Sequence, residues 1–184
     1  MTELDPRIEQ LTFYWEAHLW PRLQGLTDAE YRWTPAPDRA WDLRSGPDGG
    51  LRYVDPPREP AVVPTLAWRL MHIGIGCLQM RASAFFGDGT IPDDAGMADH
   101  RHQPATIPAT ADEALKFLET SYRWWIDGLS ALTPEGLAAP LGPKGGPYAE
   151  SPMSALVLHI NREVMHHGGE VCLLRDLYAA TVDG

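Results

Sequence analysis

Residues 65–86, TLAWRLMHIGIGCLQMRASAFF, are apolar almost all round when they are placed on a helix. A helix with apolar side chains on nearly every face is usually buried in the centre of a protein. Gly87 follows the run directly, and glycine commonly ends a helix. This stretch therefore predicts one long central helix in an all-α domain.

Three further amphipathic stretches predict the helices that pack around this central one. They span about residues 6–24, 110–132 and 152–180. Asp5-Pro6 supplies an N-cap residue followed by proline at the first helical position, and Thr110 and Glu113 have the spacing of a capping box. Four long helices without a repeat or a run of alternating strands predict an antiparallel four-helix bundle, with residues 1–184 as its single domain.

Long loops rich in proline and glycine connect the predicted helices. The longest, residues 34–64, includes SGPDGGLRYVDPPREP. Within and before it we expect a short helix at 28–33 and a hairpin that pairs 41–44 with 51–54. Structureless loops of this length are often functional. We therefore expect the loop to form part of a pocket mouth, with Trp41 and Arg44 contacting an anionic or sugar-bearing group.

Composition excludes several classes of function. A formal net charge of −10, with no local run of lysine or arginine, opposes binding to a phosphate backbone, so nucleic acid is not an expected partner. No uncharged stretch is longer than residues 70–80, which is too short to cross a bilayer, and the prediction is a cytoplasmic protein that does not bind membranes. Cys77 and Cys172 lie in apolar helical segments, where reduced cysteines serve as small hydrophobic residues.

The last predicted helix carries an unusual density of titratable side chains in HINREVMHHGGEV, residues 159–171. At 100° per residue, Glu163 and His167 point into the apolar arc of this helix. His159 and His166 fall beside the arc. Glu170 falls near its edge, where it either faces solvent or, like His166, orients a metal ligand without binding the metal itself.

A carboxylate directed at an apolar interior must be neutralised, paired or bound to a cation. Glu163 and His167 are four residues apart and offer two ligand atoms on one face, as metal sites in bundle cores do. His72, in the middle of the central helix, is the best third ligand. The structural alternative is a network in which Arg69 or Arg162 neutralises Glu163 without a metal. The remaining histidines are weaker candidates: His18, His100 and His102.

The combination of TLAWRLMHIG with HINREVMHHGGEVCLLRDLY resembles the DinB-like four-helix bundles, in particular the branch related to mycothiol-dependent maleylpyruvate isomerase and the thiol S-transferases. The resemblance spans nearly the whole chain. It implies that His72, Glu163 and His167 hold one divalent metal, commonly zinc or nickel. Many members have histidine at the position of Glu163, whereas the isomerase has glutamate there. The resemblance also implies homodimers built from bundle faces.

The function predicted from these residues is that of a metal-dependent enzyme, a thiol S-transferase or a hydrolase. Its cation would activate a low-molecular-weight thiol such as mycothiol, or water, toward a small electrophilic substrate. Two histidines and a carboxylate also match the facial triad of non-haem iron. No second Glu-x-x-His occurs, which opposes a di-iron centre. The alternative to an enzyme is a non-catalytic bundle protein that binds metal or acts in a stress response.

Overall fold

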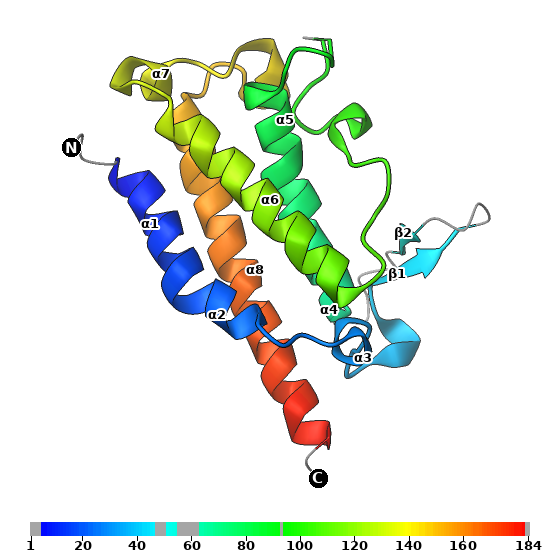
Figure 1. Cartoon of the computed structure of the whole chain (residues 1–184). Helices are drawn as coiled ribbons and strands as arrows, with labels where there is room; N and C mark the ends of the chain where they lie inside the picture. Colours follow the sequence, from blue (N-terminus) through cyan, green and yellow to red (C-terminus); the bar gives the residue numbers. More distant parts are fainter. Residues whose placement is uncertain (1–4, 47–50, 55–62, 93, 183–184) are drawn as a thin grey trace.

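The computed structural model describes residues 5–46, 51–54, 63–92 and 94–182. Four long helical rods lie side by side in it and form a bundle (Figure 1). The rods are, in chain order, α1 (Pro6–Tyr14) with the π-helical η1 (Trp15–Leu19) and α2 (Trp20–Leu23); α4 (Leu66–Met71) with the π-helical η3 (His72–Gln79) and α5 (Met80–Phe86); α6 (Ala111–Ser130); and α8 (Met153–Val182). The predicted all-α four-helix bundle is confirmed.

Local capping signals explain where the rods begin. The side chain of Asp5 accepts a hydrogen bond from the backbone N–H of Arg7, and Thr65 caps α4 in the same way. Thr110 and Glu113 form both hydrogen bonds of a capping box at the start of α6. These bonds satisfy backbone donors that a helix leaves free at its N-terminus. The predicted ends of all four rods agree with the observed ends within two residues.

The directions of the rods are more mixed than in a simple up-and-down bundle. In Figure 1, α1 and α8 run from the top of the view to the bottom, whereas the α4–α5 rod and α6 run from the bottom to the top. Asn161 accordingly contacts Arg7, and Tyr14 contacts Met165, as parallel neighbours do. The segments 87–92 and 94–110 make this possible, because they lie along the length of the bundle and bring the chain back to the end where α6 begins (Figure 1).

Smaller elements lie at the two ends of the bundle and, in the case of η4 (His100–His102), beside α5 (Figure 1). A hairpin of β1 (Asp42–Ser45) and β2 (Leu51–Val54) lies near the start of α4, and its register pairs Asp42 with Val54 (Figure 1). The predicted hairpin is present, with its first strand shifted by one residue. Residues 47–50 and 55–62 of the predicted loop lie outside the described residues. The other short helices are α3 (Asp28–Tyr31), η2 (Pro37–Arg39), η4 (His100–His102), α7 (Pro134–Ala138) and η5 (Gly142–Tyr148).

The core consists of aromatic and aliphatic side chains from all four rods. Trp125 is fully buried, and Trp15 stacks on Tyr122 with 3.9 Å between the ring centroids. Cys77 is buried, as expected for a small hydrophobic residue, and burial raises the pKa of its thiol to about 12. None of the helices in the described ranges combines the length and the apolar character that a membrane span requires.

Candidate metal centre

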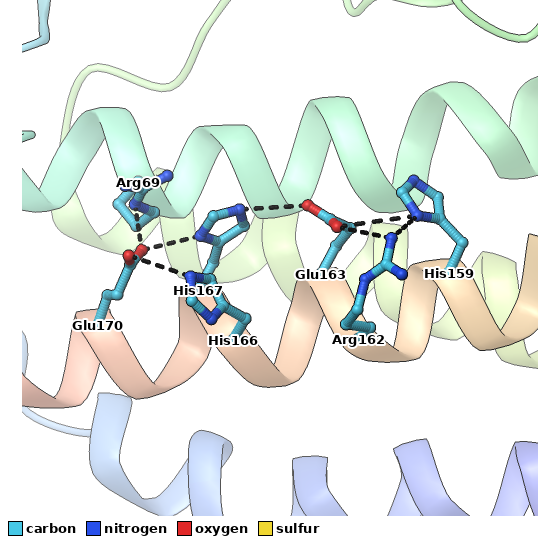
Figure 2. Close-up of polar contacts among 7 residues, drawn as sticks. All are labelled: Arg69, His159, Arg162, Glu163, His166, His167 and Glu170. Atoms are coloured by element: carbon cyan, nitrogen blue, oxygen red, sulfur yellow. Dashed lines mark hydrogen bonds and ion pairs between the residues drawn. The ribbon is translucent and has the colours of Figure 1, made fainter. Parts of the chain in front are cut away.

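Helix α8 presents a row of polar side chains to the rod formed by α4, η3 and α5 (Figure 2). The residues of this row recur every three or four positions, so they lie on one side of the helix. Figure 2 shows Arg69 reaching down from α4 to the end of the row. The members on α8 are His159, Glu163, His166, His167 and Glu170.

The structure brings His72 of the second rod against Glu163 and His167 of α8. Each of the three offers one ligand atom, and these atoms all lie within 4.8 Å of one another. Nε2 of His167 is 3.3 Å from Oε2 of Glu163. Ligand atoms about 2.1 Å from a tetrahedral zinc ion are about 3.4 Å from one another. Two imidazoles and a carboxylate at this spacing fit a single divalent ion.

The imidazole of His72 is held in place by aromatic stacking. Its ring lies parallel to that of Trp68, with 5.3 Å between the centroids and an angle of 7°. Trp41 packs in turn on Trp68, at 4.8 Å. His72 is also the first residue of η3, and π-helical turns occur frequently at functional sites. Burial lowers the pKa of His72 to about 4, so at neutral pH the ring keeps the lone pair that a metal ligand needs.

His167 uses its two ring nitrogens for different purposes. Its Nδ1–H donates to Oε2 of Glu170 at 2.8 Å, which leaves Nε2 directed at Glu163. A carboxylate on the far nitrogen fixes the tautomer of a ligating histidine and raises its basicity. The predicted role of Glu170 in orienting a metal ligand therefore has a geometric basis in its contact with His167.

A second group of potential ligands, His166, His167 and Glu170, overlaps the first. In this group the charge of Glu170 is already compensated, because Nε of the buried Arg69 lies 2.8 Å from Oε2. The Arg69 N–H is not aligned for a hydrogen bond, so this contact is an ion pair. His166 is 68% exposed and contacts Glu170 at 3.5 Å. We therefore assign Glu170 to the support of His167.

Glu163 lies at the edge of the buried face of α8, whereas the spacing of residues on the helix predicts that it points into this face. Its side chain is 27% exposed, compared with 13% for His167. The buried face of α8 also includes Asn161 and Gly168, which pack against α1, and this turns the buried arc away from Glu163. Burial is the largest single effect and raises the pKa of Glu163, but His159, His167 and Arg162 together lower it by more, so the net pKa is below the usual value.

Only some of the contacts predicted from the sequence are present; the residues concerned are Arg69, Arg162, Trp41 and Arg44. Arg162 contacts Glu163 at 3.4 Å, as the metal-free network requires, whereas Arg69 pairs with Glu170 instead. Trp41 reaches the centre through Trp68, a link that the sequence did not indicate. Arg44 is 59% exposed and pairs with Asp42 within the hairpin. The binding roles of Trp41 and Arg44 stay predictions.

Residues 10–171 match the family model of the DinB superfamily. The chain belongs to the DinB superfamily. The match covers both the His72 rod and the part of α8 that carries Glu163 and His167. No curated protein and no solved structure matches the chain. The DinB assignment thus establishes the fold family, and the chemistry has to be argued from the site.

Proposed function

We propose that this DinB protein is a metal-dependent enzyme in which His72, Glu163 and His167 bind one divalent cation. The proximity of these three side chains, from two different helices, carries the proposal. Three protein ligands with an open position are typical of catalytic zinc sites. Zinc and nickel suit the ligand set, and iron(II) suits it through the facial triad.

The surrounding residues prepare the ligands for binding. Trp68 restricts rotation of the His72 ring by stacking, and Glu170 holds the His167 ring through Nδ1. Arg69 pairs with Glu170, and Arg162 contacts only Oε1 of Glu163, so that Oε2, which faces His167, is the oxygen available to a cation. Ligands that are held in this way lose little freedom on binding, which favours affinity and a defined open position.

A bound cation would lower the pKa of a thiol or a water molecule at its open position and so supply a nucleophile at neutral pH. The chain does not offer a thiol of its own for this role. Cys77 is buried, and burial raises the pKa of both Cys77 and Cys172. A low-molecular-weight thiol, mycothiol in the branch that the sequence resembles, is therefore the proposed cosubstrate, and transfer to a small electrophile is the proposed reaction. Hydrolysis by water is the close variant.

Elemental analysis of protein purified without a chelator tests the first step. We expect close to one equivalent of zinc, nickel or iron, which His72→Ala and His167→Ala both remove. Less than about a tenth of an equivalent, with no binding on titration, overturns the proposal. The second step is tested by measuring thiol consumption with model electrophiles and a panel of thiols that includes mycothiol.

The ion pairs that both carboxylates already make favour a second candidate function, that of a non-catalytic bundle. Arg69 with Glu170, and Arg162 with Glu163, already place positive charge beside both carboxylates. In that case metal is absent or structural, no thiol reacts, and His72→Ala changes only the melting temperature. The homodimer implied by the resemblance is tested separately by light scattering.

A further inference from the structure

A cavity of about 330 Å³ lies next to the candidate metal centre, between α5, the start of α8 and the segment 141–151. Three basic side chains line it: Arg81 from α5, and His159 and Arg162 from α8. None of the described residues that line it is Asp or Glu. In a chain of net charge −10, Arg81 and Arg162 make this lining locally positive, although Glu163 compensates part of the charge of Arg162 at 3.4 Å, and burial lowers the pKa of His159 and so favours its neutral form.

Arg81 has hydrogen-bonding capacity that the protein does not use. Its Nη1 donates to the carbonyl oxygen of Met97 at 2.9 Å, whereas its Nε is buried and has no hydrogen-bond partner among the described residues. Burial lowers the pKa of this guanidinium, and the described structure pairs no carboxylate with it. A half-buried guanidinium without a paired carboxylate is costly, and an anion beside it in the cavity would offset part of that cost.

The cavity and the candidate metal centre share a wall. His159 and Arg162 line the cavity, and they also lie 3.8 Å and 3.4 Å from Oε1 of Glu163. The other carboxylate oxygen of Glu163 faces His167. His159 and Glu163 are four residues apart on α8, which corresponds to about 6 Å along the helix axis. A molecule with its head in the cavity can therefore place its body beside the centre.

The other walls select among anions. Met97, Leu141 and Leu156 contribute apolar surface, and Tyr148 and Ser151 contribute hydroxyl groups. A guanidinium fork matches the geometry of a carboxylate. A carboxylate on an apolar body satisfies both the arginines and the aliphatic walls, whereas a free phosphate dianion loses more hydration and gains nothing from those walls.

We propose that this cavity binds the substrate of the DinB protein through a carboxylate held between Arg81 and Arg162, with the body of the substrate beside His72, Glu163 and His167. The substrate class is a small organic carboxylate. The substrate role rests on the proposed function, whereas the binding of a carboxylate in the cavity does not.

Calorimetric titration of the purified protein with hexanoate tests the proposal, with hexanamide as the uncharged analogue. We expect saturable binding of hexanoate and roughly tenfold weaker binding of hexanamide. Arg81→Gln should weaken hexanoate roughly tenfold as well, and Arg162→Gln should weaken it at least severalfold. Arg123→Gln is the matched control, because Arg123 is 70% exposed on α6 and pairs with Glu119. It should leave hexanoate affinity unchanged within about twofold.

Equal binding of hexanoate and hexanamide, or unchanged affinity in both cavity variants, would overturn the carboxylate site. Stronger binding of inorganic phosphate than of hexanoate would overturn the choice of carboxylate. If Arg81→Gln does not fold, Arg162→Gln decides, because Arg162 is 69% exposed and its replacement leaves the core intact. Metal content is measured on the same samples. Carboxylate binding without metal supports the site while overturning the proposed function, and metal without carboxylate binding overturns the site alone.

Discussion

His167 and Glu170 are three residues apart on α8, and Nδ1–H of His167 donates to Oε2 of Glu170 at 2.8 Å. The same carboxylate oxygen is 2.8 Å from Nε of Arg69 on α4. One carboxylate thus links a candidate metal ligand to a buried cation on the neighbouring rod. Its removal should affect both metal binding and stability.

Glu170→Gln should lower zinc affinity by roughly tenfold or more, because an amide supports the basicity of His167 less well than a carboxylate. It should also lower the free energy of unfolding by about 1–3 kcal/mol, because Arg69 loses its ion pair. Competition with a chromogenic chelator and urea unfolding measure the two effects. Glu119→Gln on α6 is the control, since Glu119 is 36% exposed and Glu170 37%. Equal effects of the two variants would contradict the assigned role.

Glu163→Gln should weaken zinc binding by roughly tenfold or more, and His166→Gln by much less. The carboxylate of Glu163 faces His167 within the cluster, whereas His166 is 68% exposed. Isothermal titration with zinc at pH 7.5 compares the two variants directly. Equal losses of zinc affinity in the two variants would show that Glu163 is not a metal ligand in preference to His166.

The stability of the metal-free protein should depend on pH through His72. Its folded pKa is about 4, lowered by burial and by His167, whereas an unfolded histidine titrates near 6.5. As pH falls from about 6.5 to about 4, the unfolded chain binds a proton that the folded chain does not, so stability is lost over this range and fully present above it. The loss is of the order of 3 kcal/mol.

His72→Gln should flatten this pH dependence in urea unfolding measured between about pH 4.5 and 7.5. His100→Gln is the histidine control, because His100 is 86% exposed in the crossover segment. If the free energy of unfolding depends on pH as steeply in His72→Gln as in the unmodified protein, this would contradict the burial of a neutral imidazole at this position.

Two adjacent glycines of α8 should respond in opposite directions to alanine. A Cβ at Gly168 would lie 2.4 Å from Oη of Tyr14, whereas nothing lies within 4 Å of a Cβ at Gly169. Gly169→Ala should therefore stabilise the helix by about 0.5–1 kcal/mol. Gly168→Ala should be about 1–3 kcal/mol less stable than Gly169→Ala. Thermal and urea unfolding measure the difference, and it should narrow when Tyr14→Phe removes the hydroxyl. Equal stabilities would show that α1 does not pack this closely on α8.

The four helices could be predicted from the sequence because the signals that form them are local. Asp5, Thr65 and Thr110 cap helices through backbone groups two or three residues away. The spacing of Glu163 and His167 on one face of a helix is likewise a property of a single helix. Local periodicity did not reveal how far the buried face of α8 extends, because Asn161 and Gly168 are not apolar and are buried only by the packing of α1.

The sequence by itself therefore determined the helices, their ends and the titratable face of α8. Only the tertiary structure decided that His72 meets that face, that Arg69 pairs with Glu170 instead of Glu163, and that Arg81 faces the same cavity as Arg162. These contacts join residues far apart in the chain. They depend on the direction, rotation and offset of one rod against another, which are set by the packing of all four rods together.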